Sequence, residues 1–467
     1  MTAIIITIAL IGYILIATEY LTNINKAAVA IFLGAVGWVL YICYGTDFVM
    51  GQHPAEYGNF LQGASPTSLN VKQFISQNIF LKYVGKASEV VLFLTATMSI
   101  VEILMNNGCF DFVLHIMRTR NSQRLLWILA IVTLLISVNI DNLTTTVMML
   151  FMMHKIVVSR RQRMIYGSAI VLSANIGGAI TVIGDPIGLV LWNNGYVDAT
   201  NFSMSLILPC FIAWALPIFL IGRTLPDTVD RECVTLPYRG DDTRLNVWQR
   251  LLMLFVGIGG LWFIPTFHTI TRLSPFLGAL CVLSVLWIVN EVVNRKLLPT
   301  NEYINRQMPH MLRYGVIQLM LFVMGIMLFL GVLAETGFAA TAAAFIQESI
   351  GNIWIIGALA GLLSTVLNNI ASTLTAITLC MPTASASIAT APLVDYASAF
   401  VQNGAFWKMI AYTTTIGSNI LGIGSIAGLA YIKVERVRIS WYLRNIGVKC
   451  LIGGLLGFII LILTETL

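Results

Sequence analysis

The chain contains very little charge. Only 10% of its 467 residues are Asp, Glu, Lys or Arg, whereas 58% are hydrophobic and the mean hydropathy is +0.85. A soluble domain carries about 25% charged residues, so this composition excludes an ordinary soluble domain and indicates a polytopic membrane protein. The net charge of +6 lies in the loops between apolar segments, and no basic patch with interleaved aromatic residues points to nucleic acid.

Several sequence motifs are also missing. The seven cysteines form no CxxC pair and, like the five histidines, show no metal-ligand spacing, so we expect the cysteines to be packing residues. No phosphate-cradling loop is present, which argues against an ATP-driven pump, and no nucleophile–base pair suggests an enzyme. We expect no cofactor. The apolar residues 1–17 lack the basic start of a signal peptide and are predicted to be a membrane span that is retained in the mature protein.

Twelve hydrophobic segments organise the chain. A spanning helix needs about 20 residues, so the fourth and tenth segments, which are longer, can each form a re-entrant helical hairpin. The segments are 3–18, 27–44, 89–107, 125–153, 164–192, 203–222, 248–264, 273–292, 313–334, 352–381, 404–432 and 443–463.

Two short basic loops determine the topology. Residues 108–124 and 154–163 are rich in Lys and Arg, and such loops stay cytoplasmic. The segment between them, 125–153, must then enter the bilayer and return to the same side. Its middle, 137–142 (SVNIDN), places the acid Asp141 at membrane depth, where irregular backbone must be buried in protein or line a cavity. An intramembrane acid is a functional-site hypothesis by default.

The remaining loop charges complete this topology. We expect ten crossings and two hairpins, with both termini outside and the long loop 45–88 outside as well. The expected location is a bacterial cytoplasmic membrane. The polar segment 223–247 is predicted to be a cytoplasmic linker between the two halves.

The two halves resemble each other. Residues 135–143 (LISVNIDNL) align with 362–370 (LLSTVLNNI), and 177–189 (GGAITVIGDPIGL) align with 417–429 (GSNILGIGSIAGL). Each half has an odd number of crossings, so the repeat is inverted. The predicted fold is therefore an all-α membrane protein with two hairpins and two broken helices. The repeats are 1–222, with its broken helix in 164–192, and 248–467, with its broken helix in 404–432.

An inverted repeat with interrupted segments is typical of a secondary transporter whose site lies near the membrane midplane. Oxygen ligands that include one or two carboxylates suit a hard cation such as Na⁺ or Li⁺. A carboxylate that binds either the cation or a proton is the simplest antiport chemistry. The candidate residues are Ser137, Asp141, Asn142, Asn175 and Asp185 in the first half and Ser364, Asn368 and Asn369 in the second, with Ser418, Asn419 and Ser425 beside them.

Structural explanations stay open for these residues. Asp141 can cap exposed hairpin amides, the amide side chains can satisfy broken backbone, and the glycines can serve close helix packing. Glu102, inside the third segment, is either a proton relay or a buried acid paired with Lys86 or Lys26. We expect Glu335, His115 and His154 to be solvated.

Short motifs occur along nearly the whole chain: NKAA (25–28), GKASE (85–89), MSIVEI (98–103), DNLTTT (141–146), ANIGG (174–178), IGD (183–185), GNIWI (351–355), LLS (362–364) and IGSIAG (423–428). Together they resemble the NhaD family of Na⁺/H⁺ antiporters, within the wider ion transporter superfamily. The resemblance implies an electrogenic exchanger of Na⁺ or Li⁺ for protons that is most active at alkaline pH and forms a homodimer. It also implies roles in the ion path for seven of the candidates: Ser137, Asp141, Asn142, Asn175, Asp185, Ser364 and Asn369. We expect Na⁺ at Asp141, Asn142 and Asp185.

The chain departs from the family pattern at two places. Pro186, Ile187 and Gly188 follow IGD, and Asn368 stands where the family often has Asp. The alternatives are therefore a Na⁺-coupled symporter of carboxylates or divalent anions and an arsenite efflux permease.

Overall fold

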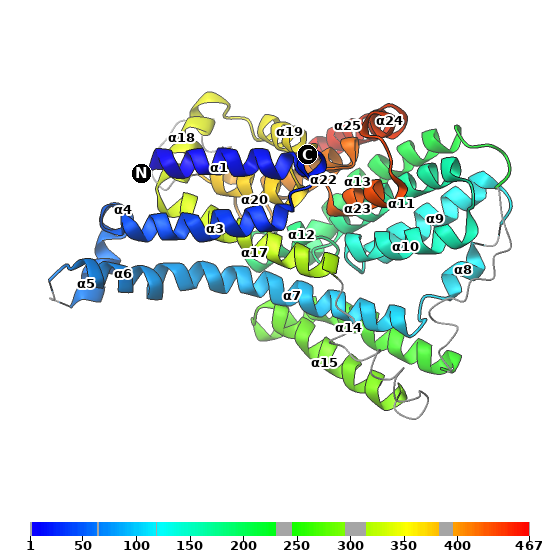
Figure 1. Cartoon of the computed structure of the whole chain (residues 1–467), viewed down its shortest axis with the longest axis horizontal. Coiled ribbons are helices and arrows are strands. Elements are labelled where there is room, and N and C mark those ends of the chain that lie inside the picture. Colours follow the sequence, from blue (N-terminus) through cyan, green and yellow to red (C-terminus); the bar gives the residue numbers. More distant parts are fainter. Residues whose placement is uncertain are drawn as a thin grey trace.

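The computed structural model describes residues 2–62, 65–117, 119–229, 245–294, 314–382 and 396–466. Within these ranges the chain is helical and contains no β-strand (Figure 1). The predicted all-α class is thus confirmed.

Eight stretches of the described residues are long and apolar enough to cross a membrane, and they match eight of the ten predicted crossings. The two remaining predicted crossings are α1 (Thr2–Ala17), with only 16 residues, and the segment formed by α11 (Arg160–Ile180) and α12 (Pro186–Asn193). The eight are Lys26–Cys43 (α3), Ser68–Asn106 (α6, η1 and α7), Ala199–Gly222 (α13), Val247–Thr271 (α14), Pro275–Asn294 (α15), Val316–Glu335 (in α17, Tyr314–Glu335), Ala405–Glu435 (α22 and α23) and Ile439–Thr466 (α24, η4 and α25).

Both predicted hairpins are present. The first consists of α9 (Ser122–Ser137) and α10 (Asn142–Ile156), and the second of α19 (Ile353–Ser364) and α20 (Asn369–Cys380). The two helices of each pair pack against each other. In each hairpin the second helix starts at an amide or acid that caps it, because polar side chains satisfy the exposed first-turn N–H groups.

Both predicted helix breaks are also present. Helix α11 ends at Ile180, and α12 starts at Pro186. Proline is tolerated in the first turn of a helix because a backbone N–H at that position would have no helical partner. Helix α22 (Ala405–Leu421) ends at Gly422, whose φ of 73° ends the helix in the left-handed conformation. Helix α23 (Ile426–Glu435) then continues.

Helix contacts recur in matched pairs across the two halves. Helix α9 packs on α11 as α19 packs on α22, and α10 packs on α23 as α12 packs on α20. Helix α3 packs on α17 as α7 (Leu81–Asn106) packs on α15. We call α1, α3, α7, α14, α15 and α17 the frame, and the two hairpins, the two broken helices, α13 and α25 (Val448–Thr466) the hairpin bundle.

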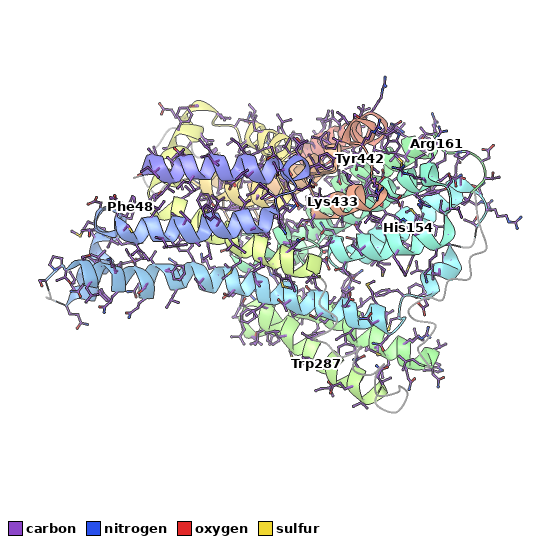
Figure 2. The ribbon with its side chains drawn as sticks, in the orientation of Figure 1. Phe48, His154, Arg161, Trp287, Lys433 and Tyr442 are labelled. Atoms are coloured by element: carbon purple, nitrogen blue, oxygen red, sulfur yellow. The ribbon has the colours of Figure 1, made fainter. Side chains whose placement is uncertain are left out.

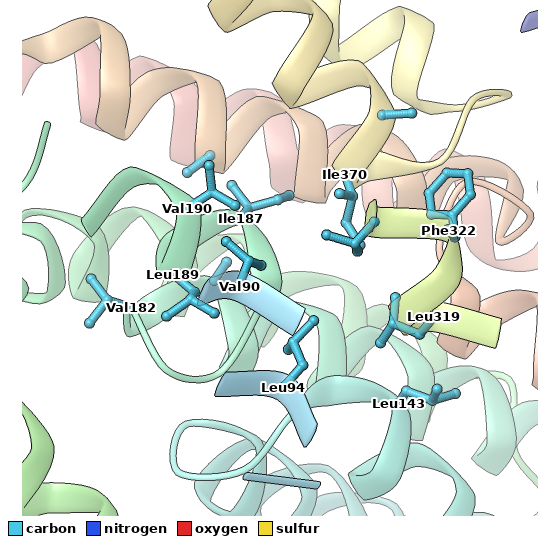
Figure 3. Close-up of a cluster of buried hydrophobic side chains, with 14 of the residues drawn as sticks. Val90, Leu94, Leu143, Val182, Ile187, Leu189, Val190, Leu319, Phe322 and Ile370 are labelled. Carbon is cyan, nitrogen blue, oxygen red and sulfur yellow. The ribbon is translucent and has the colours of Figure 1, made fainter. Parts of the chain in front are cut away.

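Apolar side chains fill the contact between frame and bundle. Figure 3 shows Val90 and Leu94 of α7 near Ile187 and Val190 of α12, with Phe322 of α17 near the start of α20. All five side chains are buried. Figure 1 shows α14 and α15 at the lower edge of the molecule, away from the second hairpin.

The segment predicted as a long loop, 45–88, is mostly helical. It contains α4 (Gly45–Gln52), α5 (Pro54–Leu61), α6 (Ser68–Phe74) and the π-helical turn η1 (Ile75–Phe80), which leads into α7. The prediction was wrong because Val49, Tyr57 and Phe74 are buried, so the segment packs on the protein. Shorter helices elsewhere are α2 (Glu19–Thr22), α8 (Phe112–Ile116), α18 (Phe338–Ser349), α24 (Ile439–Tyr442) and the π-turn η4 (Leu443–Gly447).

The start of the linker pairs with the loop before the first hairpin. Ser122 donates its N–H to Asp227 O at 3.2 Å, and Val229 donates to Arg120 O at 3.1 Å. Both segments are predicted to lie on the cytoplasmic side, so their pairing agrees with that topology. Residues 230–244 of the predicted linker lie outside the described residues.

Four of the cysteines are buried, as the packing interpretation predicts: Cys109, Cys210, Cys380 and Cys450. Cys43 and Cys281 are exposed, and Cys233 lies outside the described residues.

Candidate ion-binding site

Each hairpin tip is fastened to the broken helix of its own half by the same bond. Ser137 Oγ donates to Ala174 O at 2.6 Å, and Ser364 Oγ donates to Thr414 O at 2.6 Å. The glycines of the two breaks allow this close approach. A Cβ on Gly184 would lie 2.7 Å from Ser137 O, and a Cβ on Gly424 would collide with Ser364 O.

Asp185 links the two halves of the chain through hydrogen bonds to both hairpins. It caps α12 by accepting a hydrogen bond from Ile187 N at 3.0 Å. Its Oδ2 accepts from Asn142 Nδ2 at 3.0 Å and from Asn369 Nδ2 at 3.2 Å. One carboxylate, 2% exposed, is therefore held by the tips of both hairpins.

Asp141 combines a structural role with an unused oxygen. Its Oδ1 caps α10 by accepting from Thr144 N at 2.8 Å, as the structural interpretation requires. Its Oδ2 is buried without a hydrogen-bond partner, and so are the hydroxyls of Thr145 and Thr146 in the following helical turn. A buried carboxylate oxygen normally has a partner, so this oxygen is available to a cation or a proton. Asp141 and Asp185 lie close enough for their charges to interact.

Asn175 joins the two broken helices. Its Nδ2 donates to Asn419 Oδ1 at 2.7 Å and to Ser425 Oγ at 2.9 Å. Its Oδ1 lies 3.4 Å from Asn142 Nδ2. Ser425 in turn caps α23 through Gly428 N.

The second half repeats this geometry with neutral groups. Asn368 caps α20 through Ile370 N at 3.0 Å and leaves its Nδ2 without a partner, and Asn369 N donates to Gly424 O at 2.8 Å. In the alignment of the halves, Asn368 matches Asp141 and Ser425 matches Asp185. Both tip carboxylates therefore belong to the first half.

All eight residues predicted for the site lie at the two tips or in the broken helices beside them. Four of them, Asn142, Asn175, Asp185 and Asn369, are linked to one another by side-chain hydrogen bonds. The prediction missed four buried hydroxyls that lack partners: Thr145, Thr146, Ser372 and Thr415. A signal was available for Thr145, Thr146 and Ser372, because these hydroxyl residues follow a tip in the next helical turn. Thr415 lies in α22 and had no such signal. Among the described residues no group of three or more His, Cys, Asp or Glu side chains could hold a metal ion.

Predictions from the sequence concern four further ionisable residues, of which Glu102 and Glu335 are acids within or near membrane segments. Glu102 is 7% exposed and lies close enough to Asp141 for their charges to interact. Lys26, one of its two predicted partners, binds Glu19 at 3.3 Å. The prediction that Glu335 is solvated was wrong, because residues of the helical segment 45–88 cover it: His53 Nε2 lies 2.7 Å from its carboxylate.

His154 was also predicted to be solvated. Its side chain is only 35% exposed, and its Nε2 lies 2.8 Å from Glu435 Oε1 at the end of α23. The Glu435 carboxylate raises the pKa of His154 above its usual value. The side chain of His115 lies outside the described residues.

A cavity of about 370 Å³ borders the first tip at Val138 and Asn139. It is lined mainly by apolar residues of α13 and α14 together with Val138 and Thr181, and neither Asp141 nor Asp185 lines it. The candidate ion site is therefore a closely packed cluster at the tips and not this cavity.

Comparisons with known proteins place the chain among membrane transporters. Residues 1–417 match the family model described as citrate transporter (CitMHS). Sodium/proton antiporter 2 of Arabidopsis thaliana is 27% identical over 93% of this chain and 93% of that protein. The Na⁺/H⁺ antiporter NhaD of Vibrio parahaemolyticus is 23% identical over 76% of this chain and 84% of that protein. The YdaH transporter of Alcanivorax borkumensis has a similar fold, with a TM-score of 0.57 at 12% identity over 92% of this chain and 97% of that chain.

Proposed function

We propose that this chain, which belongs to the citrate transporter (CitMHS) family, exchanges Na⁺ or Li⁺ for H⁺ across a membrane by alternating access. The relatives named as sodium/proton antiporters support this choice of ions. The single observation that carries it is the buried, unpartnered Oδ2 of Asp141, which lies at the tip of a hairpin among unpartnered hydroxyls.

The two carboxylates have different roles in this proposal. Asp185 has its oxygens occupied by Ile187 N, Asn142 and Asn369, so it holds the two tips together and supplies negative charge. Asp141 has one free oxygen and alternates between the cation and the proton. The hydroxyls of Thr145 and Thr146, the amide oxygen of Asn142 and the nearby Asp185 carboxylate complete a set of oxygen ligands that suits a hard cation.

The exchange is electrogenic if more protons than cations move in each cycle. One elementary charge that crosses the membrane corresponds to about 2.3 kcal/mol per 100 mV. The membrane potential then drives expulsion of Na⁺ even at alkaline external pH, when the proton gradient is small.

A Na⁺-coupled carboxylate symporter is the second candidate. The unpartnered amide groups of Asn368 and Asn419 favour it, because N–H donors in the second half suit a carboxylate better than a cation. Against it, neither hairpin tip carries Lys or Arg, so a di- or tricarboxylate lacks a charged partner there.

The deciding experiment uses the purified protein in proteoliposomes with a preset proton gradient and a pH-sensitive dye. We expect NaCl and LiCl, but not KCl, to collapse the gradient, and we expect Asp141→Asn to abolish this effect while the protein still inserts. Asp198→Asn is the matched control, because Asp198 lies in an exposed segment and its side chain makes no cap. Full exchange by Asp141→Asn would contradict the role of Asp141. Uptake of labelled citrate without Na⁺/H⁺ exchange would establish the symporter instead.

We also propose an orientation of the protein in the membrane and an oligomeric state. We propose that the protein lies in a bacterial cytoplasmic membrane with both termini outside, that residues 223–247 join two repeats, 1–222 and 248–467, on the cytoplasmic side, and that it forms a homodimer. Labelling of single cysteines in intact cells from outside tests the orientation. The mass of the detergent-solubilised protein tests the assembly.

A further inference from the structure

The outer ends of the two broken helices occupy matched positions. The alignment of residues 177–189 with 417–429 continues to the ends of α12 and α23, where Asn193 matches Lys433. Asn193 is the last residue of α12, and Lys433 lies in the last turn of α23. Figure 2 shows Lys433 on α23, next to the first hairpin.

An acid from the frame side binds each of these ends. Lys433 Nζ lies 3.4 Å from Glu19 Oε1, in the short helix α2 before α3. Asn193 Nδ2 donates to Glu89 Oε2 of α7 at 2.6 Å. Glu19 and Glu89 both belong to the first half of the chain, so the two contacts arise from different elements that reach equivalent places.

Each acid also binds the start of a frame helix. Glu19 Oε2 lies 3.3 Å from Nζ of Lys26, the first residue of α3. Ser274 directly precedes α15, and its Oγ lies 3.2 Å from Glu89 Oε2 and 2.8 Å from Asn193 Oδ1, so these two acceptors share its single proton. Since α3 and α15 are the matched second helices of the two repeats, each acid joins the end of a broken helix to the start of the equivalent frame helix.

The predicted topology places the two contacts on opposite membrane faces. Lys26 belongs to a loop predicted to be cytoplasmic, whereas Ser274 follows the loop 265–272, which is predicted to be external. Among the described residues, an acid-centred contact between the hairpin bundle and the frame thus lies at each of the two predicted membrane faces.

These contacts differ from the apolar packing around them. The surface between α7 and α12 consists of aliphatic side chains such as Val90 and Val190 (Figure 3), which can slide because dispersion contacts have no preferred direction. Hydrogen bonds and ion pairs at about 3 Å are directional and break when the partners move by a few ångströms. Movement of the bundle against the frame must therefore open them.

We propose that Glu19 and Glu89 are positioning residues that hold the ends of the broken helices on the frame, and that both contacts open in each transport cycle. This inference rests on the proposed function, because it assumes alternating access. It adds that the acids act on the rate of movement and not on the ion site, since neither belongs to the hairpin tips.

The test cross-links each contact reversibly. In a Cys43→Ser and Cys281→Ser background, the pair Glu19→Cys with Lys433→Cys is joined by a bifunctional methanethiosulfonate reagent, and so, separately, is the pair Asn193→Cys with Ser274→Cys. The matched control is His154→Cys with Glu435→Cys, which lie 2.8 Å apart within the hairpin bundle. We expect loss of Na⁺-dependent exchange in both test pairs, with recovery after reduction, and no loss in the control pair.

A second measurement separates positioning from folding. Glu19→Gln removes two ion pairs, of which the one to Lys433 is half-exposed; an exposed pair of this kind corresponds to about a two- to fivefold change in rate. We expect the maximal exchange rate of Glu19→Gln to rise by about this factor while the Na⁺ concentration for half-maximal exchange stays unchanged.

Each outcome decides the inference. Exchange that survives cross-linking at either test pair, equal loss in the control pair, or an unchanged maximal rate in Glu19→Gln overturns it. Absence of Na⁺-dependent exchange in the unmodified protein refutes the proposed function itself, and the two failures are thus distinguishable.

Discussion

The most informative single change is Asn369→Ala, because it removes the bond between the second hairpin and the carboxylate of the first half. Asn369 Nδ2 donates to Asp185 Oδ2 across 184 positions of sequence, at 3.2 Å and in a fully buried setting. Alanine leaves the backbone and the start of α20 in place. The change therefore tests whether the second half contributes to the ion site.

The structure bounds the size of the effect. A hydrogen bond to a charged group contributes about 1.5–3 kcal/mol, and the 3.2 Å distance, together with the second amide from Asn142 at 3.0 Å, favours the lower end. About 1.4 kcal/mol corresponds to a factor of ten. We expect the Na⁺ concentration for half-maximal exchange to rise about tenfold, because the Asp185 anion is less well stabilised and protons compete better with the cation.

The assay is a Na⁺ titration of dye dequenching in proteoliposomes, with thermal unfolding in detergent measured in parallel. Asn352→Ala is the control, since Asn352 also caps a helix of the second hairpin, through Trp354 N at 2.9 Å, but lies at its exposed base. It should lower stability by about 1 kcal/mol without changing the Na⁺ titration. A wild-type titration in well-folded Asn369→Ala, or fully additive effects of Asn142→Ala and Asn369→Ala, would refute the shared-carboxylate argument.

Two further predictions concern the packing of the second tip and the contact between the ends of α10 and α23. In Gly424→Ala the new Cβ would meet Ser364 O and the Ser418 backbone, which cannot yield, so we expect a loss of about 1–3 kcal/mol in stability. The control is Gly259→Ala, where the new Cβ meets only ordinary contacts. Equal melting temperatures of the two variants would contradict the prediction. His154, which faces Glu435 and Arg163, has a pKa raised by Glu435, so its ion pair stabilises the fold fully below the pH at which free histidine titrates, and this stabilisation is lost as the pH rises through the raised value. Near pH 6 the melting temperature of His154→Ala should therefore lie below that of the wild type, by an amount that corresponds to at most about 1 kcal/mol. The two melting temperatures should converge at alkaline pH. A constant difference across this pH range would show that the charge of His154 is irrelevant to stability.

The positions of the hairpins and helix breaks could be read from the sequence. Asp141 and Asn142 interrupt an apolar segment too long for one span, and Pro186 and Gly422 mark places where a helix cannot continue unchanged. These are local constraints of the backbone at membrane depth, and they do not depend on which distant residues meet. The segment 45–88 was misjudged because charged residues on its surface hide the buried positions Val49, Tyr57 and Phe74.

Pairings between distant residues could not be read in the same way. The sequence suggested a solvated Glu335, but His53 and Tyr83 bind it. Lys26 was a predicted partner of Glu102, but its ammonium group binds Glu19. In each case several residues of suitable chemistry compete for a partner, and only their placement in space selects one.

The sequence by itself therefore determined the class of the protein, the two matched interruptions of its membrane segments and the identity of the polar residues at those places. It did so because apolar length, loop charge and helix-breaking residues act locally. Only the tertiary structure decided that Asp185 takes amides from both hairpins while one oxygen of Asp141 stays unpartnered. That difference depends on how two tips from opposite halves of the chain meet, and no local rule specifies such a meeting.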